Sequence, residues 1–137
     1  MLRFEISITR LTQSLCVIAV FSTAAAAFES EHLTQLKDTN ECFNCDLSGA
    51  DLSGIALQGA ELKLANLKDA QLENSKLKQS TLAEAELTGA NLFGANLEAA
   101  DLSGATLRDA DLTGANIEKA ILCNTTMPDG DVLYVGC

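Results

Sequence analysis

The sequence predicts an all-β repeat protein in which short extended segments alternate with turns and face a thin aliphatic core. A five-residue period, turn-forming residues at a fixed place in it and a low aromatic content lead to this prediction. From Cys45 to Asn124, sixteen consecutive units each carry a central Leu or Ile, and twelve carry Ala two positions earlier. A five-residue period kept for that long is a repeat signature. Aromatic residues make up only 4% of the chain, so the core is expected to be aliphatic.

An α-helix cannot use this period. At about 100° per residue, a step of five rotates each Leu by roughly 140° from the last, which would place leucines on every face. On an extended segment, residues two apart point the same way, so the Ala and Leu of one unit can share an inward side. We therefore expect the core to contain the unit centres Leu47, Leu52, Leu67, Leu87, Leu92, Leu107, Leu112, Ile117 and Leu122.

Turn chemistry supports the same prediction. In eleven units the residue two after the centre is Gly, Asp or Asn, the types that tolerate positive φ at the third position of a type II turn. Five units depart from this rule and are expected to use another turn type. Their residues at this position are Leu64, Gln79, Glu84, Ala99 and Lys119.

Tandem Ala-[Asp/Asn]-Leu-x-x units, such as Ala90-Asn91-Leu92-Phe93-Gly94, resemble the pentapeptide repeat family. The resemblance covers about 80 residues, and the flanks are similar to the ends of small bacterial and plastid-lumen members. It implies a right-handed quadrilateral β-solenoid with four pentapeptides per coil and about four coils. With about 4.8 Å between stacked strands, the rod is expected to be roughly 19 Å long.

Four segments are predicted along the chain. Residues 1–27 carry an apolar run from Leu15 to Phe21 and a small-residue region from Ala24 to Ala27, which favours a signal peptide over the alternative of a transmembrane anchor. Residues 28–41 are expected to form an N-terminal helical cap, 42–126 the solenoid and 127–137 a C-terminal cap that is either a partial coil or a short strand. Export would place the protein in the periplasm or, in a photosynthetic cell, the thylakoid lumen.

The cysteines leave alternatives open. Cys42 and Cys45 have the Cys-x-x-Cys spacing of thiol oxidoreductases, but no strand and helix surround them, so a structural pair at the start of the core is favoured. Cys123 is expected to point outward, where Cys137 can return to it as a disulfide. Without residues 1–27, which include Cys16, the count is even, as in many exported disulfide proteins.

No chemical site stands out from the sequence. A net charge of −10 argues against direct nucleic-acid binding. When residues twenty apart within the sixteen units are stacked, the only acid found over another acid is Glu98 over Glu118, so no calcium or catalytic carboxylate site is expected. His32 is the only histidine and is expected at the surface. We predict no metal, no cofactor and no small-molecule substrate.

The sequence therefore favours a non-enzymatic, exported module with a structural or protein-interaction role, an unknown protein partner and no membrane contact after signal cleavage. Two alternatives remain. Some pentapeptide repeat proteins mimic DNA and bind type II topoisomerases, which the acidity permits and the export and short length oppose. The other alternative is a thiol-redox protein that uses Cys42 and Cys45.

Overall fold

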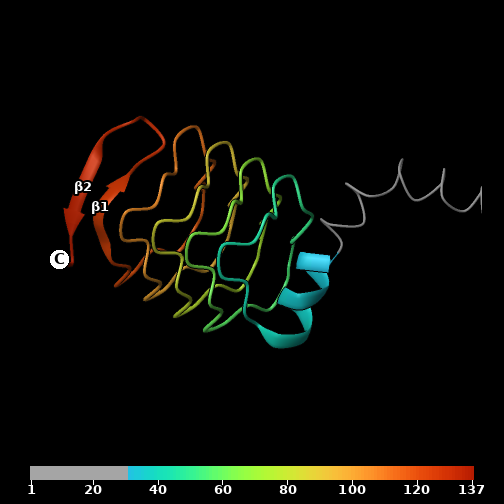
Figure 1. Cartoon of the computed structure of the whole chain (residues 1–137). Helices are drawn as coiled ribbons and strands as arrows, with labels where there is room; N and C mark the ends of the chain where they lie inside the picture. Colours follow the sequence, from blue (N-terminus) through green and yellow to red (C-terminus); the bar gives the residue numbers. More distant parts are fainter. Residues whose placement is uncertain (1–30) are drawn as a thin grey trace, which may run out of the picture. The chain divides into compact units, whose positions relative to one another are not determined.

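A computed structural model describes residues 31–137, and His32–Cys137 form one compact unit. The predicted signal peptide, residues 1–27, lies outside the described residues. Within the compact unit the chain winds into stacked coils, with a helix against the first coil and a two-stranded hairpin on the last (Figure 1). Along the sequence the coils run from green to orange, and the backbone bridges join each coil to the coil before it and the coil after it.

A regular backbone ladder holds the coils together. Parallel bridges join residues exclusively at a spacing of twenty, from Glu41↔Glu61 to Thr106↔Thr126. The amide of Leu47 donates to the carbonyl oxygen of Asn66 at 2.8 Å, and the amide of Asn66 donates back to Cys45 at 2.8 Å. Because the spacing is constant, four five-residue units complete one turn of a β-solenoid. The ladder also satisfies backbone groups that would otherwise be costly to bury.

The core is a column of central leucines lined by small residues. From Leu47 to Leu107 every central leucine is at most 1% exposed, and Leu122 is also buried. The small residues two positions earlier, such as Ala60 and Ala90, are buried beside them. Where serine replaces alanine at Ser80, its hydroxyl donates to the carbonyl oxygen of Leu77 at 2.7 Å. The sequence period therefore separates inward from outward residues over most of the solenoid.

The last coil departs from this pattern. Leu112 is half-buried and Ile117 is 37% exposed, so the prediction of Ile117 as a core residue is wrong. The reason is that no further coil covers this part of the ladder. Between residues 42 and 119, the amides of each central residue and of the residue two after it donate to a carbonyl nineteen residues later, with four exceptions. The exceptions are the amides of Leu112, Gly114, Ile117 and Lys119.

The corners without Gly, Asp or Asn also differ from expectation. All five have positive φ, between 55° at Ala99 and 62° at Leu64, so the prediction of another turn type for them is wrong. Four of their amides are ladder donors, as Leu64 donates to Ala83 at 3.0 Å and Ala99 to Glu118 at 2.8 Å, while Lys119 lies in the last coil and has no such partner. The left-handed conformation costs an ordinary residue roughly 1–2 kcal/mol, and stacking on the adjacent coil outweighs that local cost.

Residues 31–39 are helical, and this helix packs Leu36 fully into the core cluster. Polar groups next to it reach the open ladder of the first coil. Asp46 donates its amide to His32 Nδ1 at 3.1 Å, and Asn40 Nδ2 donates to the carbonyl oxygen of Gln58 at 3.0 Å. These contacts replace the hydrogen bonds that a preceding coil would provide.

At the other end, β1 (Leu122–Thr126) pairs with β2 (Val132–Val135) in an antiparallel sheet. The register is irregular between Cys123 and Thr125, and buried Thr125 donates its hydroxyl to the carbonyl oxygen of Leu102 at 2.7 Å. The tail thus leaves the coil and folds back on it, which is the strand alternative of the two predicted for this segment.

Candidate interaction surface

The outward surface is formed by the residues on either side of each central Leu or Ile. In many units the residue before the centre accepts a hydrogen bond from the backbone amide of the residue after it, as Asp46 does from Ser48 at 3.1 Å and Asp111 from Thr113 at 2.9 Å. The same bond forms at eight further units of the described chain: Asp51, Glu61, Asn66, Glu86, Asn91, Asn96, Asp101 and Asn116. Outward carboxylates and amides are therefore held in fixed orientations.

Sequence reasoning missed this role. The signal was available, because Asp and Asn side chains accept from the amide two residues on in Asx turns, and the repeat places them at that position in eight of the sixteen units. The geometry, repeated from unit to unit, explains why the second residue of the repeat is so often Asp or Asn, although it does not enter the core.

These hydrogen bonds also set the acidity of three side chains. The hydroxyl and the amide of Ser48 lower the pKa of Asp46 below its ordinary value. The backbone amide of Ser53 lowers the pKa of Asp51. The hydroxyl of Thr113 lowers the pKa of Asp111. In each case the hydrogen bond stabilises the charged form of the carboxyl group. Asp46, Asp51 and Asp111 are therefore negatively charged at neutral pH.

One side of the solenoid, which we call the acidic face, consists of residues 51–54, 71–74, 91–94 and 111–114. It carries Asp51, Glu73 and Asp111 but no Lys or Arg. Parallel bridges align its four strips, with Asn91 paired to Gln71 on one side and to Asp111 on the other. Phe93 lies in the third strip and is 44% exposed. The acidic face therefore combines one sign of charge with a single exposed aromatic side chain.

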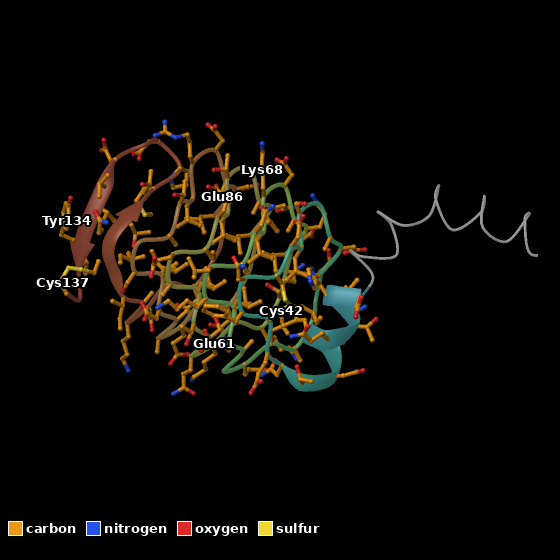
Figure 2. All side chains as sticks on the ribbon, viewed as in Figure 1. Cys42, Glu61, Lys68, Glu86, Tyr134 and Cys137 are labelled. Carbon is orange, nitrogen blue, oxygen red and sulfur yellow. A yellow bond between two sulfur atoms is a disulfide. The ribbon has the colours of Figure 1, made fainter. Side chains whose placement is uncertain are left out.

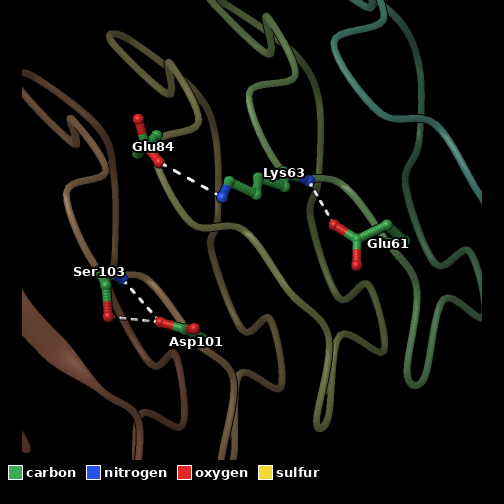
Figure 3. A network of polar contacts seen from close by, with 5 residues as sticks. All are labelled: Glu61, Lys63, Glu84, Asp101 and Ser103. Atoms are coloured by element: carbon green, nitrogen blue, oxygen red, sulfur yellow. Dashed lines mark hydrogen bonds and ion pairs between the residues drawn. The ribbon is translucent and has the colours of Figure 1, made fainter.

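The other sides of the solenoid carry Lys or Arg as well as acidic side chains. Lys63 Nζ lies 3.5 Å from Glu84 Oε1, and the Lys63 amide donates to Glu61 at 3.1 Å (Figure 3). On another side, Lys78 Nζ lies 3.0 Å from Glu98 Oε1. The stacked pair Glu41↔Glu61 was missed from the sequence because Glu41 precedes the first counted unit.

All four described cysteines are paired. Cys42 and Cys45 form a disulfide with an S–S distance of 2.02 Å, and Cys123 and Cys137 form a second one. Figure 2 shows Cys42 close to the helix and Cys137 at the opposite end beside Tyr134. Cys42 and Cys45 are buried, so in this form neither sulfur is placed to act as a nucleophile on an outside substrate.

The single histidine is half-buried and bonded to the first coil rather than fully on the surface. Residues 31–137 contain no group of three or more His, Cys, Asp or Glu side chains positioned to share a metal ion. No helix in this part of the chain is both long enough and apolar enough to cross a bilayer.

A family model described as pentapeptide repeats matches the chain in eight copies, over residues 41–79, 65–92 and 90–127. The chain belongs to the pentapeptide repeat family. The matched residues include the bridged ladder and the acidic face, so the β-solenoid and its outward columns are those of a pentapeptide repeat protein. No curated protein matches the chain significantly.

Several solved pentapeptide repeat structures are similar. HetL, involved in heterocyst differentiation regulation in the cyanobacterium Nostoc sp. strain PCC 7120, is 33% identical over 68% of this chain and 51% of its own, with a TM-score of 0.34. The chain thus spans about half the length of HetL. A pentapeptide repeat protein from the Arabidopsis thaliana thylakoid lumen is 29% identical over 66% of this chain and 70% of its own, with a TM-score of 0.35. QnrB1, a plasmid-mediated fluoroquinolone resistance protein, is 22% identical over 64% and 62%, with a TM-score of 0.35.

Proposed function

We propose that this pentapeptide repeat chain is an exported, non-enzymatic module that binds a protein partner through the outward side of a right-handed, four-coil solenoid. The helix and the hairpin act as its two caps. The observation that carries the proposal is the set of side chains held by hydrogen bonds in front of the backbone ladder, as at Asp51 and Asn91. Binding is favoured when the contacting side chains are already ordered, because less conformational entropy is lost.

The acidic face is the part of this surface that we assign to the partner. Asp51, Glu73 and Asp111 have no basic side chain within the face, which favours a partner surface containing Lys or Arg. Phe93, in the middle of the face, offers an aromatic anchor of the kind that dominates binding energy when it enters a pocket. A partner with basic residues around an apolar pocket fits both features.

Capture from an extract of the exported compartment tests this proposal. The tagged chain is compared with the variant Asp51→Asn/Glu73→Gln/Asp111→Asn, which keeps the hydrogen-bond acceptors but removes the charges, and with Phe93→Ser. Capture of a specific partner should fall at least tenfold in both, and should weaken as salt rises. Glu118→Gln/Lys119→Gln, outside the acidic face, is the matched control and should capture normally. Equal capture by all four chains would refute the assignment to this face.

Export rests on the sequence of residues 1–27, and a separate experiment tests it. The proposal expects the protein in the exported fraction to begin directly after Ala26 or Ala27. Mass spectrometry of the intact protein measures that N-terminus. An uncleaved chain found only in the cytosol would overturn export while leaving the interaction surface to be tested on its own.

The acidic face also favours a second candidate, DNA mimicry toward a type II topoisomerase, since three carboxylates share one side of the rod. Inhibition of DNA supercoiling distinguishes the two. Under our proposal the wild-type chain leaves supercoiling by the purified enzyme unchanged. Inhibition by the wild type that the triple acidic-face variant loses would establish the second candidate instead.

A further inference from the structure

The two disulfides differ in their access to solvent. Cys42 is fully buried and Cys45 is only 4% exposed, beneath a helix whose Leu36 is also fully buried. Cys137 is exposed at the end of the chain and Cys123 is half-buried. Attack by a thiolate on a disulfide requires direct approach to one of its sulfurs. A reductant therefore reaches the second disulfide in the folded protein and not the first.

We propose that Cys123–Cys137 is a reducible latch, a site of thiol–disulfide exchange with a dithiol reductant, and that its reduction releases β2 from the last coil. One thiolate of the reductant attacks the exposed sulfur of Cys137, and the S–S bond breaks with Cys123 as the leaving thiolate. The second thiol of the reductant then displaces Cys137 from the mixed disulfide. Two electrons and two protons pass to the protein as two thiols, and the reductant becomes a disulfide.

The contacts of β2 explain why the disulfide controls its position. Three of its four residues, Val132, Tyr134 and Val135, are exposed, and Tyr134 is 69% exposed. Only Leu133 packs against the core cluster. The pairing with β1 is interrupted by the irregularity in register, and a two-stranded hairpin has little stability of its own. Besides the disulfide, this strand is held by its short pairing with β1, the hydrogen bond from the Met127 amide to Asp131 and the packing of Leu133.

Loop closure gives the size of the effect. The disulfide joins residues 14 apart in sequence, and cross-linking a loop of about 15 residues favours the closed arrangement by roughly 100-fold. Reduction should raise the open population of the hairpin by about this factor. The freed edge of β1 adjoins the ladder positions at Ile117 and Lys119, which already have no following coil. Release thus extends an open strand edge, the kind of surface that another strand can join.

The test uses the full chain treated with dithiothreitol under native conditions, followed by alkylation and peptide mapping. The peptide that contains Cys16 is scored separately. Cys123 and Cys137 should become alkylated at least tenfold faster than Cys42 and Cys45. Amide hydrogen exchange of Leu133 and Tyr134 should accelerate roughly 100-fold after reduction, while the amides of Leu87 and Leu92 keep their rates.

The variant Cys123→Ser/Cys137→Ser separates the latch from other effects of the reductant. It should show fast exchange in β2 without dithiothreitol and no further change when dithiothreitol is added. Equal or faster alkylation of Cys42 and Cys45 would overturn the difference in access. The latch would be refuted if the amide exchange rates of β2 in the reduced protein, or in the variant, stayed within threefold of those in the oxidised wild type.

Discussion

At corners such as Ala99, the backbone conformation of one residue is fixed by a hydrogen-bond partner nineteen residues away and not by its own preference. Ala99 has a φ of 55° because its amide donates to the carbonyl oxygen of Glu118. Sequence rules for turns are local, so they correctly predicted positive φ where Gly, Asp or Asn occur and failed at residues such as Leu64 and Ala99. The failure shows that stacking, rather than turn chemistry, fixes the coil.

This leads to a matched pair of substitutions with opposite effects. Ala99→Gly should stabilise the protein by about 0.5–1 kcal/mol, because glycine adopts the left-handed conformation without strain. Ala83→Gly, at a corner position whose φ is not positive, should destabilise it by a similar amount, about 0.5–1 kcal/mol, since glycine gains freedom in the unfolded chain. Urea denaturation measures both, and destabilisation by Ala99→Gly equal to that by Ala83→Gly would contradict the assigned backbone.

The outward aspartates predict the dependence of stability on pH. The pKa values of Asp46, Asp51 and Asp111 are lower in the folded protein than the ordinary value of 3.8. Below that value the unfolded chain takes up protons before the folded one does, so their stabilising contribution is complete above about pH 4 and is lost as pH falls through the folded pKa.

The variant Asp46→Asn/Asp51→Asn/Asp111→Asn checks this. It keeps the acceptors of the turn hydrogen bonds but no longer titrates, so its free energy of unfolding should fall less between pH 6 and pH 3 than that of the wild type. Denaturation curves at the two pH values provide the comparison. Identical pH dependence in both proteins would show that these hydrogen bonds do not favour the charged form.

At the scale of the element, a coil is complete only when another element covers it. Leu97 and Ile117 occupy equivalent positions one coil apart, yet Leu97 is fully buried and Ile117 is not. The five-residue period predicted both as core residues. It could not show that the tail turns back after β1 and leaves the last coil partly open, because the period describes residues within the coil and not the segment beyond it.

The same pair gives a test of the open coil. Leu97→Ala should destabilise the protein by about 2–5 kcal/mol, as expected for a leucine cavity in a closed core. Ile117→Ala should cost about 1 kcal/mol, because solvent already reaches that side chain and truncation leaves no sealed cavity. Thermal and urea denaturation measure the difference. A cost for Ile117→Ala as large as that for Leu97→Ala would mean that something covers the last coil.

For the whole molecule, the sequence predicted the β-solenoid, the inward leucines and the family, because all three depend on a period that is visible in the chain. It did not reveal the acceptor role of Asp46 and its equivalents or the exposure of Ile117. Those features depend on contacts between coils and on the ends of the stack. The acidic face is likewise a property of the folded chain, since Asp51, Glu73 and Asp111 share a face only after coiling.

Amide hydrogen exchange, measured residue by residue, tests the stacked ladder most directly. We predict strong protection at Leu92, Gly94, Leu97 and Ala99, whose amides donate to the next coil, and fast exchange at the equivalent positions one coil later. Those positions are Leu112, Gly114, Ile117 and Lys119. Equal exchange rates in the two sets would contradict a ladder with a twenty-residue repeat that ends at the last coil.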